Sequence, residues 1–413
     1  MDWMTKPNLL AVHEARRLMA EGSLSASELI QACYRQIESL NARLNAFITV
    51  IPPANQLASV PSEGGEEAAG SLAGIPVAVK DLFDTQNVRT TAGSFFFRGN
   101  IPSADSHVVA SLKEQGAYII GKTNTHEIAL GVTTANPHFG ACLNPWDPTR
   151  IPGGSSGGSA VAVATGMALA AVGTDTGGSI RIPAALCGVV GLKPTYGRVS
   201  LRGVTPLSWN LDHAGPLTRT VRDATLMLQV IAGYDPEDPY CSSQPIDDYT
   251  RGLEDGIRGW RVALAKGNYA ENSEAEVAQA VQSAAEALGQ IGADVTLVDV
   301  SYLHDAAKAN GQITQADGSA FHRDRLAEHP EWFGEDVRRR LEAGRDLGSS
   351  DYVLARHTQA ETMHRLNRLF DEHRILVLPT TPICAPTAGQ DAVEQSRTLT
   401  RFTAPLAILA AVP

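Results

Sequence analysis

Residues 173–183 read Gly-Thr-Asp-Thr-Gly-Gly-Ser-Ile-Arg-Ile-Pro and place Ser179 directly after two glycines. A serine hydroxyl presented on such a turn can act as a nucleophile once a base removes its proton. The glycines allow main-chain N–H groups to gather around an anionic intermediate. The pattern therefore indicates acyl-transfer chemistry at Ser179, with an ordinary Gly-Gly-Ser turn as the alternative.

Two upstream segments contain residues that could activate this serine. Residues 152–160 read Pro-Gly-Gly-Ser-Ser-Gly-Gly-Ser-Ala and include Ser155. Residues 74–81 read Gly-Ile-Pro-Val-Ala-Val-Lys-Asp, so Lys80 follows an apolar run typical of a buried strand. Burial disfavours the charged form of lysine and lowers its pKa from about 10.4. Lys80 is therefore a candidate base, since serine–lysine arrangements exist beside serine–histidine ones.

Together the three segments resemble the amidase signature family of serine hydrolases. The resemblance runs from about residue 11 to about residue 233, and more loosely to the last residue of the sequence. It matches Ser179 to the nucleophile and Lys80 to the base. It matches Ser155 to a bridging serine that follows a cis peptide bond. The separation of the two serines is also the one found in the family.

The resemblance implies a proton relay. Neutral Lys80 accepts a proton from Ser155, which accepts one from Ser179 as Ser179 attacks the amide carbonyl. The reverse relay protonates the departing amine, and water then attacks the acyl-enzyme. The oxyanion would be bound by main-chain N–H groups, which the resemblance assigns to Thr176, Gly177, Gly178 and Ser179. No cofactor is expected.

Each of these residues also has a purely structural interpretation. Lys80 could be a strand-end lysine that reaches solvent, Ser155 part of a Gly/Ser loop, and Ser179 the cap of a turn. Their occurrence in order, each in its matching context, favours the catalytic interpretation. A phosphate-binding loop is disfavoured because the segment lacks Gly-x-x-x-x-Gly-Lys-Ser/Thr.

Other reactive side chains give weaker patterns. The sequence has no His-Glu-x-x-His motif, so His126, Glu127 and His213 are interpreted as structural, and no metal is expected. Cys187 lies in the apolar run 184–190, where a buried and unreactive thiol is expected.

The composition limits the classes of binding partner that we expect for this protein. Acidic residues (45) outnumber Lys and Arg (34), which gives a net charge of −11 and disfavours a nucleic-acid-binding face. The five cysteines form no Cys-x-x-Cys motif, which favours a reducing compartment. No apolar run reaches the ~18 residues of a membrane span. We expect a cytoplasmic protein with a small-molecule amide substrate and no direct nucleic-acid or membrane partner; a homodimer stays open.

Alternating strand-like and helix-like segments predict an α/β fold. Ser25-x-x-Glu28 is a capping box for the second helix. The expected strands are 75–79, 118–120, 169–172, 189–192, 261–265, 293–300 and 375–378. The expected helices are 8–21, 25–45, 105–115, 157–167, 223–233, 273–291, 303–328, 335–344 and 351–373, with loops at 54–71 and 234–256.

The resemblance implies the same architecture, a three-layer α/β/α sandwich around a large mixed, mostly parallel sheet. We expect a single domain over 1–413, with N-terminal helices in 1–60, the signature core in 70–235 and a variable second half in 236–413. Family members usually continue with further strands and a final helix after a segment like 401–413. We therefore expect Leu406, Ile408 and Leu409 to lie on an incompletely covered helix.

Two enzymes share these motifs. The leading prediction is a stand-alone amidase; the alternative is the glutaminase (A) subunit of a tRNA-dependent amidotransferase, and a catalytically inactive scaffold is a third. The subunit class typically reads Gly-Ser-Asp-Thr-Gly-Gly-Ser-Ile-Arg-Gln-Pro, whereas this chain has Thr174 and Ile182 at the two differing places. The aliphatic Ile182 favours the stand-alone enzyme. We expect the substrate pocket to involve 130–134, the loop 94–98 and helices near 303–345.

Overall fold

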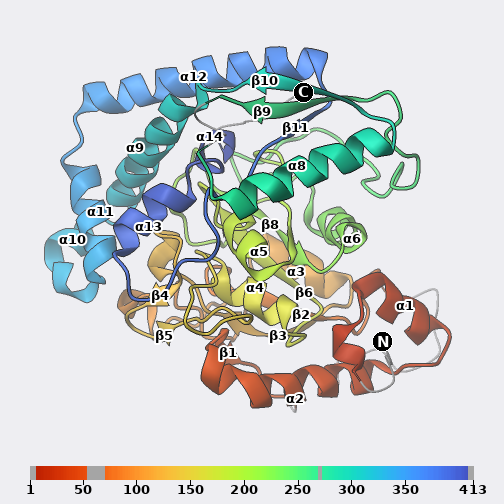
Figure 1. Ribbon diagram of the computed structural model, residues 1–413. Helices are drawn as coiled ribbons and strands as arrows, with labels where there is room; N and C mark the ends of the chain where they lie inside the picture. Colours follow the sequence, from red (N-terminus) through yellow and green to blue (C-terminus); the bar gives the residue numbers. More distant parts are fainter. Residues whose placement is uncertain (1–5, 54–69, 268–271, 408–413) are drawn as a thin grey trace.

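The computed structural model describes residues 6–53, 70–267 and 272–407. The expected loop 54–71 falls almost wholly outside these ranges. Within them the α/β class predicted from the sequence is confirmed, and the fold is built on a larger mixed sheet and a smaller parallel sheet, both covered by helices (Figure 1).

The larger sheet has six strands in the order β1-β3-β2-β6-β8-β7. Its central strand β2 pairs in parallel with both β3 and β6. The remaining pairs, β1–β3, β6–β8 and β7–β8, are antiparallel. The strands are β1 (Phe47–Val50), β2 (Pro76–Lys80), β3 (Tyr118–Thr123), β6 (Ala170–Asp175), β7 (Val190–Gly191) and β8 (His213–Thr218).

Helices from the first half of the chain pack against this sheet. They are α1 (Val12–Ala20), α2 (Ala26–Leu44), α3 (His107–Glu114), α4 (Gly157–Ala164), α5 (Arg181–Cys187) and α6 (Val221–Ile231). The predicted capping box is present, since Glu28 N donates to Ser25 Oγ at 3.1 Å and Ser25 N donates to Glu28 Oε2 at 2.8 Å. One apolar cluster joins β2, β3 and β6 to α1–α6, so the strand that ends at Lys80 and the strand that leads to Ser179 lie in the main core.

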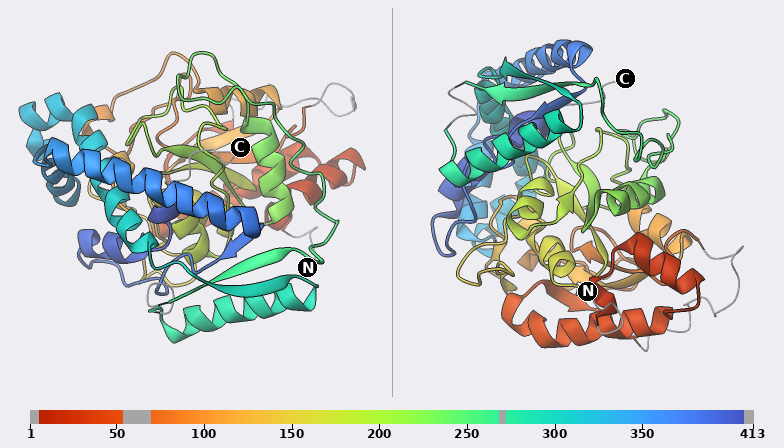
Figure 2. Two further views of the ribbon diagram at one scale, coloured as in Figure 1. Left: turned by 90° about the horizontal axis from the view of Figure 1, so that it is seen from above. Right: turned by 45° about the vertical axis from the view of Figure 1, so that its right-hand side comes forward.

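The second half forms its own three-stranded parallel sheet in the order β10-β9-β11. Its strands are β9 (Arg261–Lys266), β10 (Asp294–Asp299) and β11 (Ile375–Val377). Helix α8 (Ala275–Gln290) lies on one side of these strands and α12 (Ser349–Glu372) on the other, as Figures 1 and 2 both show.

The other helices of this half lie beside the larger sheet, at the left of Figure 1. Helix α9 packs against α11, α12 and α14. The helices are α9 (Leu303–Phe321), α10 (Arg323–Glu328), α11 (Glu335–Arg345), α13 (Ala392–Leu399) and α14 (Ala404–Ala407). Short elements complete the fold: η1 (Pro7–Leu9), η4 (Phe95–Phe97), η5 (Glu127–Ala129), η6 (Pro330–Trp332), β4 (Ala135–Asn136) and β5 (Gly140–Ala141).

The structure differs from the sequence prediction in a few elements. The expected helix 303–328 is divided at His322 into α9 and α10. Strands β1 and β8 and helix α5 were not predicted. Strand β8 contains Gly215 and Pro216, which are rare in strands, and it is held by antiparallel pairing with β6. Leu406 is half-buried in α14, whereas Ile408 and Leu409 lie outside the described residues.

In the part of the chain that the structure describes, no helix has both the length and the apolar character needed to cross a bilayer. Nor do the described His, Cys, Asp and Glu side chains form a group of three or more that could hold a metal ion.

Candidate active site

The structure brings Lys80 and Ser155 into direct contact. Lys80 is the last residue of β2 and is wholly buried. Its Nζ donates to Ser155 Oγ at 2.7 Å and to Thr174 Oγ1, on the neighbouring strand β6, also at 2.7 Å. Burial lowers the pKa of Lys80 to about 7, against the opposing effect of the Asp212 and Asp175 charges. A lysine in this position can therefore be neutral near physiological pH.

Ser155 is held by the loop that precedes α4. The Gly154–Ser155 peptide bond is cis, as the family resemblance implied. Ser155 is fully buried, and its carbonyl accepts a hydrogen bond from His126 N at 3.2 Å. The next residue ties this loop to the nucleophile turn, since Ser156 N donates to the Ser179 carbonyl at 3.1 Å. The two serine-bearing segments are thus fixed relative to each other by main-chain contacts.

Glycine is required at two points of these loops. A Cβ on Gly154 would lie 2.6 Å from Thr134 Oγ1. Gly178 has φ of +142°, and a Cβ there would lie 2.3 Å from Thr403 Oγ1. Both distances are too short for real contacts, so a side chain at either position would displace the loop.

Ser179 follows the turn at the end of β6 and is 4% exposed. It lines a cavity of about 640 Å³ together with Thr176 and Gly177, two of the predicted oxyanion-binding residues. Leu130, Gly131 and Val132 form another part of the wall, and residues of α9, α11, α13 and α14 form most of the rest. This volume lies in the range of small-molecule binding sites.

Asp175 organises the turn that carries Ser179. Its carboxylate accepts hydrogen bonds from Gly178 N at 2.7 Å and Ile180 N at 3.1 Å, and a two-pronged interaction from Arg181. Burial alone would raise the pKa of Asp175, but the charge and hydrogen bonds of Arg181 outweigh it and hold the pKa well below its usual range. The turn is thus anchored around a permanent carboxylate.

Because of this anchoring, the main-chain N–H groups predicted to bind the oxyanion are not equally available. The N–H group of Gly178 is already engaged by Asp175. Among the contacts of the described residues, the N–H groups of Gly177 and Ser179 have no such acceptor. The Thr176 carbonyl accepts from Asn310 Nδ2 at 3.1 Å, which fixes the start of the turn from α9. The turn therefore keeps donors that an anion could use.

A second buried carboxylate, Asp212, borders the site. Thr176 Oγ1 donates to Asp212 Oδ1 at 2.6 Å, and the main-chain N–H groups of Leu207 and Ser208 donate to Oδ2 at 2.8 and 3.0 Å. Burial raises the pKa of Asp212 to about 6, against the effects of these hydrogen bonds and of Lys80. Above this pH, Asp212 places a negative charge near Lys80.

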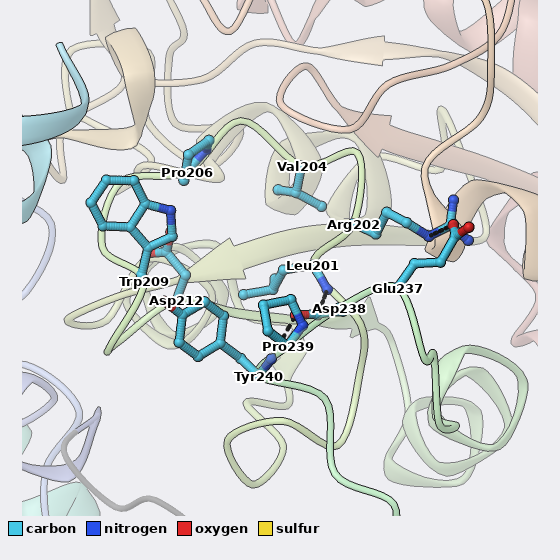
Figure 3. A pocket seen from close by; sticks show the side chains of 10 residues that line it. All are labelled: Leu201, Arg202, Val204, Pro206, Trp209, Asp212, Glu237, Asp238, Pro239 and Tyr240. Atoms are coloured by element: carbon cyan, nitrogen blue, oxygen red, sulfur yellow. Dashed lines mark hydrogen bonds and ion pairs between the residues drawn. The ribbon is translucent and has the colours of Figure 1, made fainter.

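Figure 3 shows that Asp212 also lines a separate, smaller cavity of about 240 Å³. Leu201, Trp209 and Tyr240 lie around it, and Arg202 and Glu237 lie at one end. Leu207, bonded to Asp212 through its N–H, lines the larger cavity instead. The segment 206–212 therefore borders both cavities, and Ser179 lines only the larger one.

The other reactive side chains are buried in the protein and make contacts away from Lys80 and Ser155. His126 is buried, and its Nε2 lies 2.8 Å from Asp336 Oδ2. Burial lowers the pKa of His213 to about 3, and its Nδ1 lies 2.6 Å from the Leu211 carbonyl oxygen. Cys187 is fully buried, as predicted, and burial raises its thiol pKa well above the usual value.

The predicted pocket is partly correct. Residues 130–132 and the helix residues near 304–315 line the cavity, but the loop 94–98 does not. Instead Phe95 and Phe96 pack against Trp332, with ring centroids 5.0 and 5.2 Å apart, and Phe96 also packs against Phe333. The sequence did not identify Asp212 or Asn310 as residues of the site, because no local motif marks them. It also did not predict the contact between Thr174 and Lys80.

Comparisons with known proteins show which family this chain resembles. The model of the Amidase family matches residues 28–412. The glutamyl-tRNA(Gln) amidotransferase (A) subunit of Geobacter sp. (strain M21) is 39% identical over 402 residues, which are 90% of this chain and 82% of that protein.

Solved structures give the same result. One is described as a vestigial protein complex that reveals the evolutionary origins of an s-triazine catabolic enzyme. It has a TM-score of 0.91 and 34% sequence identity, and the match covers 97% of this chain and 89% of that chain. Another, described as an amidase, has a TM-score of 0.86 and 35% identity and covers 97% of this chain and 90% of its own.

Proposed function

Since this chain belongs to the amidase family and is an amide hydrolase, we propose that it cleaves a small carboxamide through an acyl-enzyme on Ser179, with Ser155 and Lys80 as the proton relay. The observation that supports this most directly is the 2.7 Å contact between the buried Lys80 Nζ and Ser155 Oγ. Both groups lie in the main core, next to the turn that presents Ser179 to the cavity.

The first step is attack by Ser179 on the amide carbonyl. A neutral amine has two N–H bonds and one lone pair. Thr174 Oγ1, 2.7 Å away, takes one N–H of Lys80, which leaves the lone pair free to accept the proton of Ser155. Ser155 in turn accepts the proton of Ser179 as the C–O bond forms. The buried surroundings make Lys80 a usable base because they disfavour its charged form.

The negative charge of the tetrahedral intermediate is stabilised by the nucleophile turn. We assign this role to the main-chain N–H groups of Thr176, Gly177 and Ser179. Gly178, also predicted for this role, donates to Asp175 and serves here by shaping the turn. One such donor contributes on the order of 3 kcal/mol to transition-state stabilisation.

Collapse of the intermediate breaks the C–N bond. Protonated Lys80 returns a proton through Ser155 to the leaving nitrogen, so that ammonia or an amine departs rather than an amide anion. Water then enters, loses a proton through the same relay and cleaves the ester to Ser179. The products are a carboxylate and ammonia or an amine.

A fluorophosphonate that modifies reactive serines tests this assignment. Peptide mapping should find the label on Ser179, and Ser179→Ala should lose both labelling and turnover. Ser156→Ala is a suitable comparison, since Ser156 lies next to Ser155 but contacts the Thr174 carbonyl rather than Lys80. Full activity of Ser179→Ala, or labelling at another serine, would contradict the mechanism.

A second candidate function comes from the relative named as an amidotransferase (A) subunit. In that case the chain would release ammonia from glutamine for a partner protein. The two sequence differences from the subunit pattern, of which Ile182 favoured a stand-alone enzyme, contribute little in the structure. Thr174 contacts Lys80 through a hydroxyl that serine also has. Ile182 is buried against Val132, Ile151 and Leu399 and does not line the cavity.

Ammonia release separates the two candidates. The purified chain is assayed with glutamine and with simple aliphatic and aromatic amides. Turnover of simple amides in preference to glutamine supports the stand-alone amidase. Preference for glutamine supports the amidotransferase function, and binding to a partner protein then becomes the next measurement.

We further propose a single domain over residues 1–413 and a cytoplasmic location. All five cysteines are free thiols, and Cys384 is exposed, which fits a reducing compartment.

A further inference from the structure

The smaller cavity, drawn in Figure 3, has an excess of negative charge among the described residues that line it. The carboxylates of Asp212, Glu237 and Asp238 belong to its wall. The basic residue of the wall, Arg202, is already neutralised, because its Nε lies 2.7 Å from Asp235 Oδ2 and 3.2 Å from Glu237 Oε2. The charges of Asp212 and Asp238 are therefore left over.

These two carboxylates have no close cationic partner in the part of the chain that the structure describes. Neither has a lysine, arginine or histidine nitrogen within 4.0 Å. Lys80 acts on Asp212 only from beyond this distance. Asp212 and Asp238 are nevertheless buried, with 6% and 8% of their surface exposed. Since buried charges are ordinarily paired, a cation in the cavity would supply the missing partner.

The hydrogen bonds of the two carboxylates limit the kind of cation. Asp212 already accepts three hydrogen bonds. Asp238 accepts two, from the main-chain N–H groups of Leu201 and Tyr240 at 2.7 and 2.9 Å. Because an ionised carboxylate has about four acceptor sites, few remain for a primary ammonium ion, which brings three donors. A quaternary ammonium ion carries the same charge and needs no acceptor.

Two aromatic rings favour the same ligand. Trp209 and Tyr240 line the cavity, and Figure 3 shows both rings at the end where Asp212 lies. Tyr196 contacts both residues, since its hydroxyl donates to the Trp209 carbonyl and its ring packs edge-on against Tyr240, with centroids 6.5 Å apart. Aromatic faces attract methylated ammonium groups through cation–π interactions. The rest of the wall offers apolar surface for methyl groups, from Leu201, Val204, Pro206 and Pro239.

From this lining we propose that the smaller cavity binds a quaternary ammonium ion, a small molecule that ends in a trimethylammonium group. The charged group lies beside Asp212 and the rings of Trp209 and Tyr240. The volume of about 240 Å³ is below the ~300–1,000 Å³ of drug-sized ligand sites, which suits a small ion. The site is separate from the cavity at Ser179 and does not depend on the reaction proposed there.

Choline and 3,3-dimethylbutan-1-ol test the role of the charge. The two molecules have the same shape, but a carbon atom replaces the charged nitrogen in the alcohol. Titrations of the purified protein, followed by NMR at the equivalent methyl protons of each molecule, measure both affinities. Choline should bind at least ~10-fold more tightly than the alcohol. Its affinity should fall with added salt, whereas that of the alcohol should not.

Ethanolamine tests the preference for a quaternary ion. It has the hydroxyethyl group of choline but a primary ammonium group, whose three donors find few acceptors in the cavity. Its dissociation constant, measured by competition with choline, should be several-fold higher than that of choline.

Variants locate the bound ion. Tyr240→Leu and Asp212→Asn should each weaken choline binding several-fold, and Asp212→Asn should leave binding of the alcohol unchanged. Tyr234→Leu is the matched control, because Tyr234 is exposed like Tyr240 but does not line the cavity. If Asp212→Asn disturbs the fold, Tyr240→Leu still decides, because this side chain is 45% exposed.

Equal affinities for choline and the alcohol would overturn the inference. So would binding of ethanolamine as tight as that of choline, or equal effects of Tyr240→Leu and Tyr234→Leu on choline binding.

Discussion

Replacing Lys80 with methionine should stabilise the protein near neutral pH while it removes activity. Lys80 is fully buried, and its folded-state pKa of about 7 lies well below the 10.5 of an ordinary lysine. Between these two values the unfolded chain binds more protons than the folded one. The stability of the wild type must therefore rise with pH across this window, and methionine removes this dependence.

The size of the effect follows from the two pKa values. Between about pH 7.5 and about pH 10, the free energy of unfolding of the wild type should gain about 3 kcal/mol relative to Lys80→Met, with a slope that approaches 1.4 kcal/mol per pH unit in the middle of this range. The charged groups that act on Lys80 are Asp212 and Asp175. Both are ionised in this window, since the pKa of Asp212 is about 6 and that of Asp175 is lower.

Urea unfolding of both proteins at several pH values measures the difference directly. Lys113→Met, at an exposed lysine on α3 that pairs with Asp105, controls for loss of a surface charge and should not reproduce the slope. Two parallel stability curves for the wild type and Lys80→Met would refute the reasoning. They would mean that Lys80 remains charged in the folded protein and cannot act as the base.

Four further outcomes are expected. Lys80→Arg should lower kcat by at least ~10³-fold, measured by ammonia release, because a guanidinium stays charged; robust turnover would exclude Lys80 as base. In the wild type kcat/KM should rise with pH through about 7, as Lys80 loses its proton. Because the Asp212 charge raises the pKa of Lys80, Asp212→Asn should move this rise to lower pH. A shift to higher pH would contradict this. Gly178→Ala should lower kcat/KM by at least ~10-fold, because the new Cβ would clash with Thr403 and the φ of +142° disfavours a side chain. Unchanged kinetics would show that the turn can relax around the new side chain. Dialysis against EDTA should leave turnover unchanged, since the proposed relay uses only protein groups; activity restored by added metal would contradict it.

The sequence predicted the parts of the site that lie in short motifs. Lys80, Ser155 and Ser179 each stand in a segment of distinctive composition, and Lys80 also follows an apolar strand-like run. Lys80 and Ser155 meet in the structure, and Ser179 faces a cavity beside them. The cis bond before Ser155 could be expected only from the family resemblance, because nothing in the local composition requires it.

What could not be predicted depends on contacts between distant segments. Asp212 reaches Thr176 from 36 positions further along the chain, and Asn310 reaches it from 134. Strand β8 was missed because Gly215 and Pro216 hide its pattern, and pairing with β6 decides its conformation. The loop 94–98 was expected to line the pocket, and only the distant Trp332, against which Phe95 and Phe96 pack, shows that it does not.

The origin of the cavity walls has an evolutionary consequence. The relay residues lie between positions 80 and 179, on strands and loops of the main core, whereas much of the wall of the larger cavity comes from helices after position 303. Substitutions on those helices can alter which amide is accepted without moving the relay. Divergence in substrate range should therefore require few compensating changes in the first half of the chain, and an exchange of α9, α11 and α13 between relatives is a direct route to new substrates.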